Sequence, residues 1–214
     1  MAVEIRRAEA KDAAFIAWVE LAASRSHRPI GFLDLAFPGD EKQRLTLIER
    51  LCRSEVFSIC HWSGFFVAEV DGEPAAALSG YEPTKRGSDT FAAAMFEGLG
   101  GAGWSREDVA AVFGRMAPFL ECVSDPADDR WVVEWVATRP EFRGRGLVHT
   151  LLRSILEEGR SRGYRHSQIS VLIDNHPAQH AYESAGFVVE REKCHPEFEQ
   201  TFGSPGIRRM AREL

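Results

Sequence analysis

The second half of the chain alternates strands with helices, and this order constrains the fold more than any other feature. Apolar runs rich in Val, Ile and Trp are separated by glycine-containing loops and by stretches of helical spacing. Chains of this kind form a mixed α/β sheet with helices packed on its faces. We expect strands over residues 130–137, 168–173, 187–192 and 206–213, and helices over 146–162 and 175–185.

The first half extends this pattern with two helices and a hairpin. Residues 3–8 predict a short strand, and residues 11–24 predict a helix because apolar side chains recur there at helical spacing. A turn-rich segment, residues 27–40, separates this helix from a second amphipathic helix, which carries Leu45, Ile48 and Leu51. The dipeptide Asp71-Gly72 stands between two apolar runs, which is a strong signal for a β-hairpin.

The segment 86–129 lies between the hairpin and the strand at residue 130 and has the least regular pattern. A short helix around Phe91 and Met95 is expected to precede the flexible sequence LGGAG. Ser105 and Asp108 have the spacing of a capping box, which predicts a helix that Pro118 ends or kinks. The segment is long enough to act as a lid or to form an oligomer contact, and the sequence leaves both open.

Composition excludes several classes of protein. The 214 residues are enough to bury a core without disulfides or metal. A net charge of −6 gives no support for binding nucleic acid or an anionic membrane. The N-terminal residues carry no apolar stretch of signal-peptide length, and the longest uncharged run, 56–68, is too short to span a membrane. Four cysteines without a CxxC pair suggest neither zinc nor a disulfide framework, so we expect a cytoplasmic protein without metal.

A glycine-rich loop begins the helix expected at residue 146. Glycines at positions 144 and 146 allow backbone N–H groups to turn toward an anion, and a helix N-terminus adds unpaired donors. Arg143 and Arg145 have the chemistry to pair with phosphate oxygens. The loop therefore indicates a phosphate site, although a tight turn with two solvated arginines would look the same.

A second feature runs from residue 173 to residue 187 and reads IDNHPAQHAYESAGF. Asn175 or His176 can cap a helix that Pro177 helps to initiate, and Gly186 ends it. Small residues on this helix allow a close approach to its backbone. Tyr182 would lie one turn beyond Ala178, and a tyrosine packed on the sheet with its hydroxyl at the surface would fit equally well.

Taken together, these two features resemble the GNAT superfamily of N-acetyltransferases. The family's acyl-CoA loop, Arg/Gln-x-x-Gly-x-Gly/Ala, is matched from Arg143 onward except at Val148, where the family prefers Gly or Ala. Its later signature, Asn-x-x-Ala-x-x-x-Tyr-x-x-x-Gly-Phe, is matched in full from Asn175 to Phe187. The resemblance covers residues 130–193 firmly and the first 85 residues in outline.

The resemblance implies a GNAT-like fold and a division of the chain. The central mixed, mostly antiparallel sheet is expected to be splayed at the cofactor site and to carry helices on both faces. One acyl-CoA N-acyltransferase domain would span residues 1–214. Within it, residues 1–129 would supply the acceptor-side helices and the insertion, 130–193 the acyl-CoA-binding core and 194–214 the C-terminal strand region.

The resemblance also implies an activity: transfer of an acetyl or other short acyl group from acetyl-CoA to a primary amine of a small molecule or peptide, by direct attack on the thioester. The amide near Val136 would polarise the thioester carbonyl, and Tyr182 would donate a proton to the departing thiolate. The residues expected to contact acetyl-CoA are Val136, Ala137, Thr138, Arg143, Gly144, Arg145, Gly146, Leu147, Val148, Asn175 and Ala178.

Glu134 is the candidate base, because an amine with a pKa of about 10 must lose a proton before it attacks. In the run WVVEWVA it would share a strand face with Val132 and Val136, and apolar surroundings raise the pKa of a carboxyl group. A carboxylate paired with a neighbouring arginine is the alternative for this position.

The acceptor is not named by the sequence. Aromatic and acidic residues intermix in the first half, which would suit a small amine with an apolar part, although most of these aromatics would also fit a helix–sheet core. The aromatic residues are Phe32, Phe37, Phe57, Trp62, Phe91, Phe96 and Trp104, and the acidic ones are Asp34, Asp40, Asp89 and Glu97. Pairing of C-terminal strands would make a homodimer, and nothing in the sequence decides it.

Two other classes of function compete with an enzyme. A catalytically silent acyl-CoA-binding sensor or interaction module would keep the loop without turnover; Tyr182 favours the enzyme, and Val148 keeps the binder open. A different nucleotide-binding protein is less well supported, because the loop lacks the GK[ST] of a P-loop and the full GxGxxG fingerprint.

Overall fold

The computed structural model describes residues 2–123 and 126–214, and within those ranges its strands form one seven-stranded sheet. The strand order is β1-β2-β3-β4-β5-β7-β6, and all neighbouring pairs are antiparallel except β4 and β5. This confirms the expected mixed, mostly antiparallel sheet. The strands are β1 (Val3–Arg7), β2 (Phe65–Val70), β3 (Glu73–Tyr81), β4 (Arg130–Thr138), β5 (His166–Leu172), β6 (Val188–Cys194) and β7 (Gly206–Glu213).

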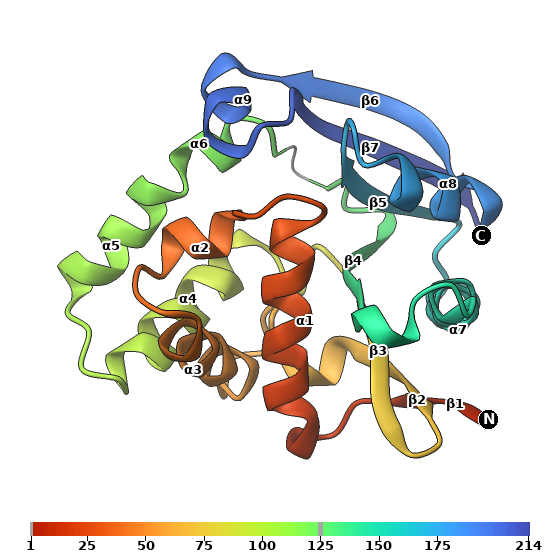
Figure 1. The fold of residues 1–214 in the computed structure, drawn as a ribbon, viewed down its shortest axis with the longest axis horizontal. Coiled ribbons are helices and arrows are strands. Elements are labelled where there is room, and N and C mark those ends of the chain that lie inside the picture. Colours follow the sequence, from red (N-terminus) through yellow and green to blue (C-terminus); the bar gives the residue numbers. More distant parts are fainter. Residues whose placement is uncertain (1, 124–125) are drawn as a thin grey trace.

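Helices cover both faces of the sheet. Figure 1 shows α1 to α5 on one side, which we call the α1 side, and α7 on the other, the α7 side. The helices are α1 (Ala13–Arg25), α2 (Phe32–Ala36), α3 (Glu41–Cys52), α4 (Ser88–Gly100), α5 (Arg106–Arg115), α6 (Ala117–Leu120), α7 (Leu147–Ser161), α8 (His176–Ser184) and α9 (Pro196–Phe202). Within the described ranges, none of them is both long and apolar enough to cross a membrane.

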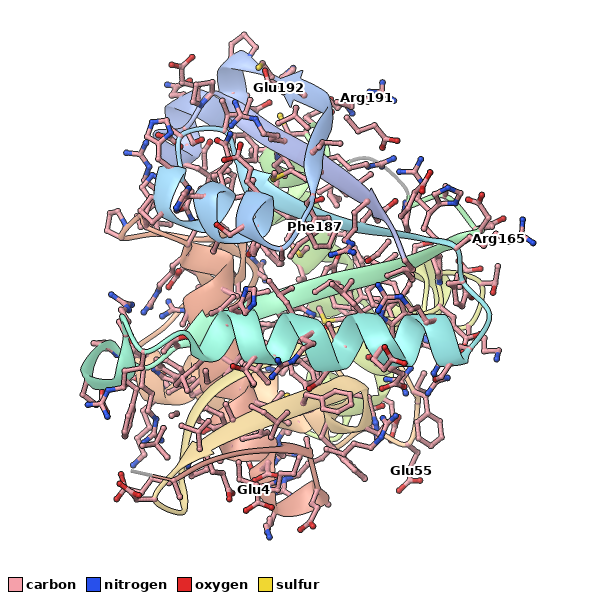
Figure 2. All side chains as sticks on the ribbon, turned by 90° about the vertical axis from the view of Figure 1, so that its right-hand side faces the viewer. Glu4, Glu55, Arg165, Phe187, Arg191 and Glu192 are labelled. Atoms are coloured by element: carbon pink, nitrogen blue, oxygen red, sulfur yellow. The ribbon has the colours of Figure 1, made fainter. Side chains whose placement is uncertain are left out.

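The α7 side follows directly from an amphipathic pattern. Leucine and isoleucine side chains of α7 are buried against the sheet, while Arg153, Glu157 and Arg160 are exposed. Phe187, between α8 and α7 in Figure 2, belongs to the same buried cluster as Leu151 and Tyr182. This packing fixes the N-terminal end of α7 relative to α8.

Strands β4 and β5 are neighbours only at their beginnings. Their parallel pairing runs from Arg130 and His166 to Val133 and Ile169 and then stops. Beyond that point β4 remains paired with β3, and β5 remains paired with β7. The sheet is therefore splayed, and the facing edges of the second halves of β4 and β5 are left without a strand between them.

Three segments differ from the sequence-based expectations. The turn-rich region after α1 contains α2, and the region after β6 contains α9. Helix α4 continues through Leu99 and Gly100, so the expected flexible LGGAG is partly helical. Ser124 and Asp125, within the segment expected to form a lid or a contact, lie outside the described residues. In the rest of that segment, α4 packs on α3, α5 on α2 and α6 on α9.

Candidate active site

An irregularity in β4 decides which way its side chains point. The pairing with β3 shifts between Ala77 and Ser79, so that two residues of β4 lie opposite one residue of β3. Trp135 adopts a left-handed backbone with φ of 55°, within a β-bulge that accommodates the extra residue. Trp135 packs into the core on the α1 side, whereas Val136 packs into the core on the α7 side.

Because of the bulge, the neighbours of Glu134 differ from those expected from the sequence. A regular strand would have placed Glu134 on one face with Val132 and Val136. Because the bulge adds a residue, Val136 turns to the α7 side, and Glu134 faces α1 together with Trp135. A left-handed conformation at a bulky residue costs about 1–3 kcal/mol and is therefore uncommon. The alternation of apolar residues along the sequence gives no sign of this bulge.

Glu134 has the electrostatic character expected of a base. Its half-buried side chain accepts a hydrogen bond from the hydroxyl of Tyr81 on β3. Burial disfavours the charged carboxylate and raises its pKa to about 7, while the hydrogen bond from Tyr81 opposes part of that rise. No arginine contributes to this balance, which argues against the alternative of a paired structural carboxylate.

The edge of β4 next to the bulge offers unused backbone groups. The N–H of Arg139 donates to the carbonyl of Ala75 on β3 at 2.8 Å. Because successive N–H groups of a strand point to opposite edges, those of Val136 and Thr138 face the gap toward β5, where no strand pairs with them. The second half of β4 can therefore pair with an extended ligand as it would with another strand.

The loop before α7 forms an open cradle of amides. Gly144 and Gly146 have φ of 74° and 72°, and beyond the adjoining backbone no atom of the described residues lies within 4 Å of the position where either would carry a Cβ. The amide of Thr150 donates to the carbonyl of Gly146 at 3.2 Å, so the N–H groups of Leu147 and Val148 precede the first hydrogen-bonded turn. These donors are directed at the loop and carry the positive end of the helix dipole.

Local packing accounts for a valine at position 148, where the family prefers Gly or Ala, and for the positions of the two arginines. The side chain of Val148 packs against the α7-side core, which leaves its amide at the cradle. Arg145 donates to the carbonyl of Glu141 at 3.2 Å and lies 5.2 Å from the ring of Phe142. Arg143 lies near the carbonyl of Thr138 at 3.4 Å. Both residues are exposed, and these contacts hold their guanidinium groups beside the loop.

Helix α8 places Tyr182 in the core beside the splayed strands. The Asn175 side chain caps the helix by accepting from the Ala178 amide at 3.2 Å, and Ala178 packs against the α7-side core. Tyr182 is 6% exposed, its ring is 6.4 Å from that of Phe187, and burial raises the pKa of its hydroxyl above the ordinary value. Tyr182 therefore stays protonated at physiological pH and is able to donate.

A set of contacts that the sequence did not predict ties the end of α1 to the start of α8. Arg28 forms an ion pair with Asp174, and His27 Nε2 lies 3.4 Å from Asp174 Oδ1. Asn175 Nδ2 donates to Ser26 Oγ at 2.6 Å. We call these residues, Ser26, His27, Arg28, Asp174 and Asn175, the clasp. Its two halves are far apart in the sequence, so no local pattern links them.

The acceptor-side residues mostly hold the fold. Phe37 is fully buried, and Phe32 stacks on Phe119 with a centroid separation of 4.0 Å. Asp34 is paired with Arg25. Of the other residues proposed for this side, Asp40 caps α3, Glu97 accepts hydrogen bonds from Ser54, Glu55 and Val56, and Phe57 and Phe96 are exposed. Among the described residues, no three His, Cys, Asp or Glu side chains gather as a metal site.

The geometry agrees with a comparison of the sequence with known families. The sequence profile of the Acetyltransferase (GNAT) family matches residues 44–187. The chain belongs to the GNAT acetyltransferase family. This GNAT protein is an N-acetyltransferase, which transfers an acetyl group from acetyl-CoA to an amine.

Individual relatives resemble the GNAT chain over most of its length. It is 31% identical over 154 residues to the streptothricin acetyltransferase of Streptomyces lavendulae, which covers 71% of this chain and 78% of that protein. An N-acetyltransferase from Staphylococcus aureus Mu50 shares the fold with a TM-score of 0.66 at 18% identity, covering 98% of this chain and 100% of the other. The yncA protein of Salmonella typhimurium, solved with its cofactor acetyl-CoA, superimposes with a TM-score of 0.55 at 17% identity, covering 100% and 95%.

Proposed function

We propose that the second half of β4 and the cradle before α7 together hold acetyl-CoA. Acetyl-CoA has an extended pantetheine arm, which needs a hydrogen-bonding partner, and a pyrophosphate, which needs hydrogen-bond donors. The open edge of β4 and the amides before α7 offer these two kinds of group. Val136, Ala137 and Thr138 would pair with the arm along the open edge of β4, and residues 143–148 would donate amides to the pyrophosphate. Asn175 and Ala178 would form the opposite wall at the start of α8. When bound, acetyl-CoA supplies the activated acetyl group.

The base in this proposal is Glu134. Its pKa of about 7 leaves a useful fraction ionised at neutral pH while keeping it a strong enough acceptor of a proton from an ammonium group. The bulge at Trp135 places this carboxyl next to the open edge of β4. That juxtaposition, a carboxyl group with a raised pKa beside unpaired strand amides, is the observation that carries the proposal.

Tyr182 is proposed as the acid that protonates the leaving thiolate. Its buried hydroxyl stays protonated around neutral pH, where part of Glu134 is ionised, so the acid and the base are in their required states together. Tyr182 packs on the α7 side, whereas Glu134 faces the α1 side. The proton would therefore leave the acceptor amine on one face of the sheet and reach the thiolate from the other.

The acceptor we propose is a primary amine of a small molecule. Support comes from the relative that acetylates streptothricin, which aligns with 71% of this chain. Peptide amino termini are the second candidate. A single sheet that uses strands from Val3 to Glu213 supports the assignment of residues 1–214 to one catalytic domain.

The test is a thiol-release assay with acetyl-CoA and a panel of amines, run beside calorimetric titration of acetyl-CoA. We expect release with at least one small-molecule amine, and Glu134→Gln should bind acetyl-CoA normally while losing release. Binding without release from any small amine or peptide would favour a silent acyl-CoA-binding protein. Release with peptides alone would contradict the proposed acceptor and leave the rest of the proposal standing.

A further inference from the structure

A second carboxyl group is buried near the proposed base and has no assigned role. Glu20, in the middle of α1, is 0% exposed. Its Oε1 accepts a hydrogen bond from Cys52 Sγ of α3 at 3.7 Å, and the thiol of Cys60 also donates to this carboxyl group. Its Oε2 is buried and has no hydrogen-bond partner among the residues that the structure describes.

The burial of Glu20 fixes its protonation state. Removing a carboxylate from water without a cationic partner is too costly, and burial keeps the pKa of Glu20 well above its ordinary value. The two thiols are likewise fully buried, and their pKa values are raised, so they remain donors. At neutral pH, Glu20 is therefore a carboxylic acid that accepts at Oε1 and has a proton to donate from Oε2.

The groups that face this acid come from every element packed around it. Cys52 lies on α3, Cys60 on the loop before β2, Tyr81 on β3 and Glu134 on β4. The negative charge of Glu134 acts on Glu20, on Cys60 and on the hydroxyl of Tyr81. In this set Glu134 is the group that ionises first, and the others stay neutral around it.

An unpaired buried oxygen is rare in native proteins and costs about 1–3 kcal/mol, so its persistence calls for a reason. Two thiols orient one oxygen of Glu20 and leave the other without a partner, and α1, which carries Glu20, packs on β4, which carries Glu134. A neutral O–H dipole near a carboxylate stabilises its charge without adding a competing charge.

We propose that Glu20 is a positioning residue for the base: it stays a neutral acid, and the dipole of its unpartnered Oε2–H, together with the hydrogen bond from Tyr81, steadies the ionised form of Glu134. The inference rests on the proposed role of Glu134. No group other than Glu134 exchanges a proton with the acceptor, and the proton of Glu20 remains on Glu20 throughout turnover.

The first experiment measures kcat/KM against pH for the wild type, Glu20→Leu and Glu20→Gln, with the best amine of the panel. Leucine fills a similar volume without a donor, whereas glutamine keeps an N–H donor. We expect the acid limb of Glu20→Leu to move up by about one pH unit, which is a tenfold loss on that limb. The acid limb of Glu20→Gln should move from its wild-type position by no more than about a quarter of that shift.

The controls separate this effect from damage to the fold. Val19→Ala creates a cavity at a buried neighbour of Glu20 on α1 and should lower the Tm without moving the acid limb. An unmoved limb in a folded Glu20→Leu overturns the proposal. A downward shift in both Glu20 variants also overturns it, because it would mean that Glu20 is ionised and repels the base.

The second measurement needs neither turnover nor a destabilising variant. Infrared spectra of the wild type at pH 8.5 should contain the C=O band of a protonated buried carboxyl group, absent in Glu20→Gln and retained in Glu134→Gln. If that band is missing from the wild type, the proposal fails whatever the kinetics show. If instead Glu134→Gln keeps wild-type activity and its acid limb, the proposed base is wrong, and the infrared result on Glu20 still stands.

Discussion

The cofactor side and the acceptor side of this acetyltransferase are built on different principles. On the cofactor side, the groups offered to a ligand belong to the backbone: the open edge of β4 and the amides before α7. On the acceptor side, side chains fill the space, with Phe32 stacked on Phe119 and Asp34 paired with Arg25. Backbone recognition needs glycines and a strand end, which leave a pattern in the sequence, whereas side-chain recognition depends on contacts between distant segments.

The sharpest way to test this difference is to remove the side chain that does chemistry while leaving the backbone site intact. Glu134→Gln should lower kcat/KM by about 100-fold or more, because general-base catalysis contributes that much, with the Kd for acetyl-CoA unchanged. Thiol release and calorimetry measure the two quantities. If Glu134→Gln lost affinity for acetyl-CoA as much as it lost turnover, cofactor binding and base catalysis would not depend on separate groups.

The same variant has a consequence for stability with a definite sign. The folded-state pKa of about 7 lies above the ordinary value of 4.5, so the wild type loses stability as pH rises from about 4.5 to 7. Glutamine does not titrate, and the variant should gain up to about 3 kcal/mol relative to the wild type between pH 4 and pH 8. Chemical denaturation at the two pH values checks this, and a constant difference would contradict the raised pKa.

The converse test disrupts the backbone site and leaves the acceptor side untouched. Gly146→Asp places a carboxylate at the cradle and a side chain at a φ of 72°, and the Kd for acetyl-CoA should rise about 100-fold. Gly163→Asp is a matched control, since Gly163 has a φ of 88° and equally open space. It follows α7 at the opposite end, so it should share the loss of stability and keep the affinity.

A smaller effect is expected at Tyr182. A thiolate is a good leaving group, so Tyr182→Phe should lower kcat by about tenfold and leave the Kd for acetyl-CoA within twofold. Phe187→Leu, which alters a neighbouring ring of the same buried cluster, controls for packing. Unchanged turnover in Tyr182→Phe would remove this residue from the mechanism.

The smallest effect concerns the residue that joins the two sides. Asn175→Ala removes the cap of α8 and the bond to Ser26, and should cost about 1 kcal/mol of stability. Ser26→Ala keeps the capping oxygen of Asn175 and removes only the acceptor of its Nδ2–H. If both variants lower the Tm equally, the contact with Ser26 rather than the cap carries the stabilisation.

Sequence reasoning found the elements that have local causes. The pattern of α7 and the hairpin at Asp71-Gly72 follow from periodicity and turn chemistry, and both are present. Short helices were missed because a single turn leaves no periodicity: at the start of α2 the Asp34 carboxylate accepts a hydrogen bond from the Gly31 amide, within a segment rich in turn residues. Because glycine has no side chain to complete a capping box, the sequence carries no such start signal for α2.

The site was only partly predictable for a related reason. The glycines of the cradle and the cap of α8 appear in the sequence, since each acts on its own neighbours. The bulge at Trp135 contains no glycine that would mark it in the sequence. Val136 was therefore wrongly expected on the same face as Glu134. Glu20 drew no notice because an acidic residue on an amphipathic helix normally lies in solvent, and only the packing of α3 and β4 reveals its burial.

The clasp also determines when an active molecule can first exist during synthesis. Arg28 and Asp174 are separated by 146 positions in the chain, so the end of α1 emerges from the ribosome long before its partner. At about 5–20 residues per second, that wait lasts roughly 7–30 s. Throughout it, Arg28 has no Asp174 with which to pair, and activity should appear in a translating population only after the last third of the chain has been made.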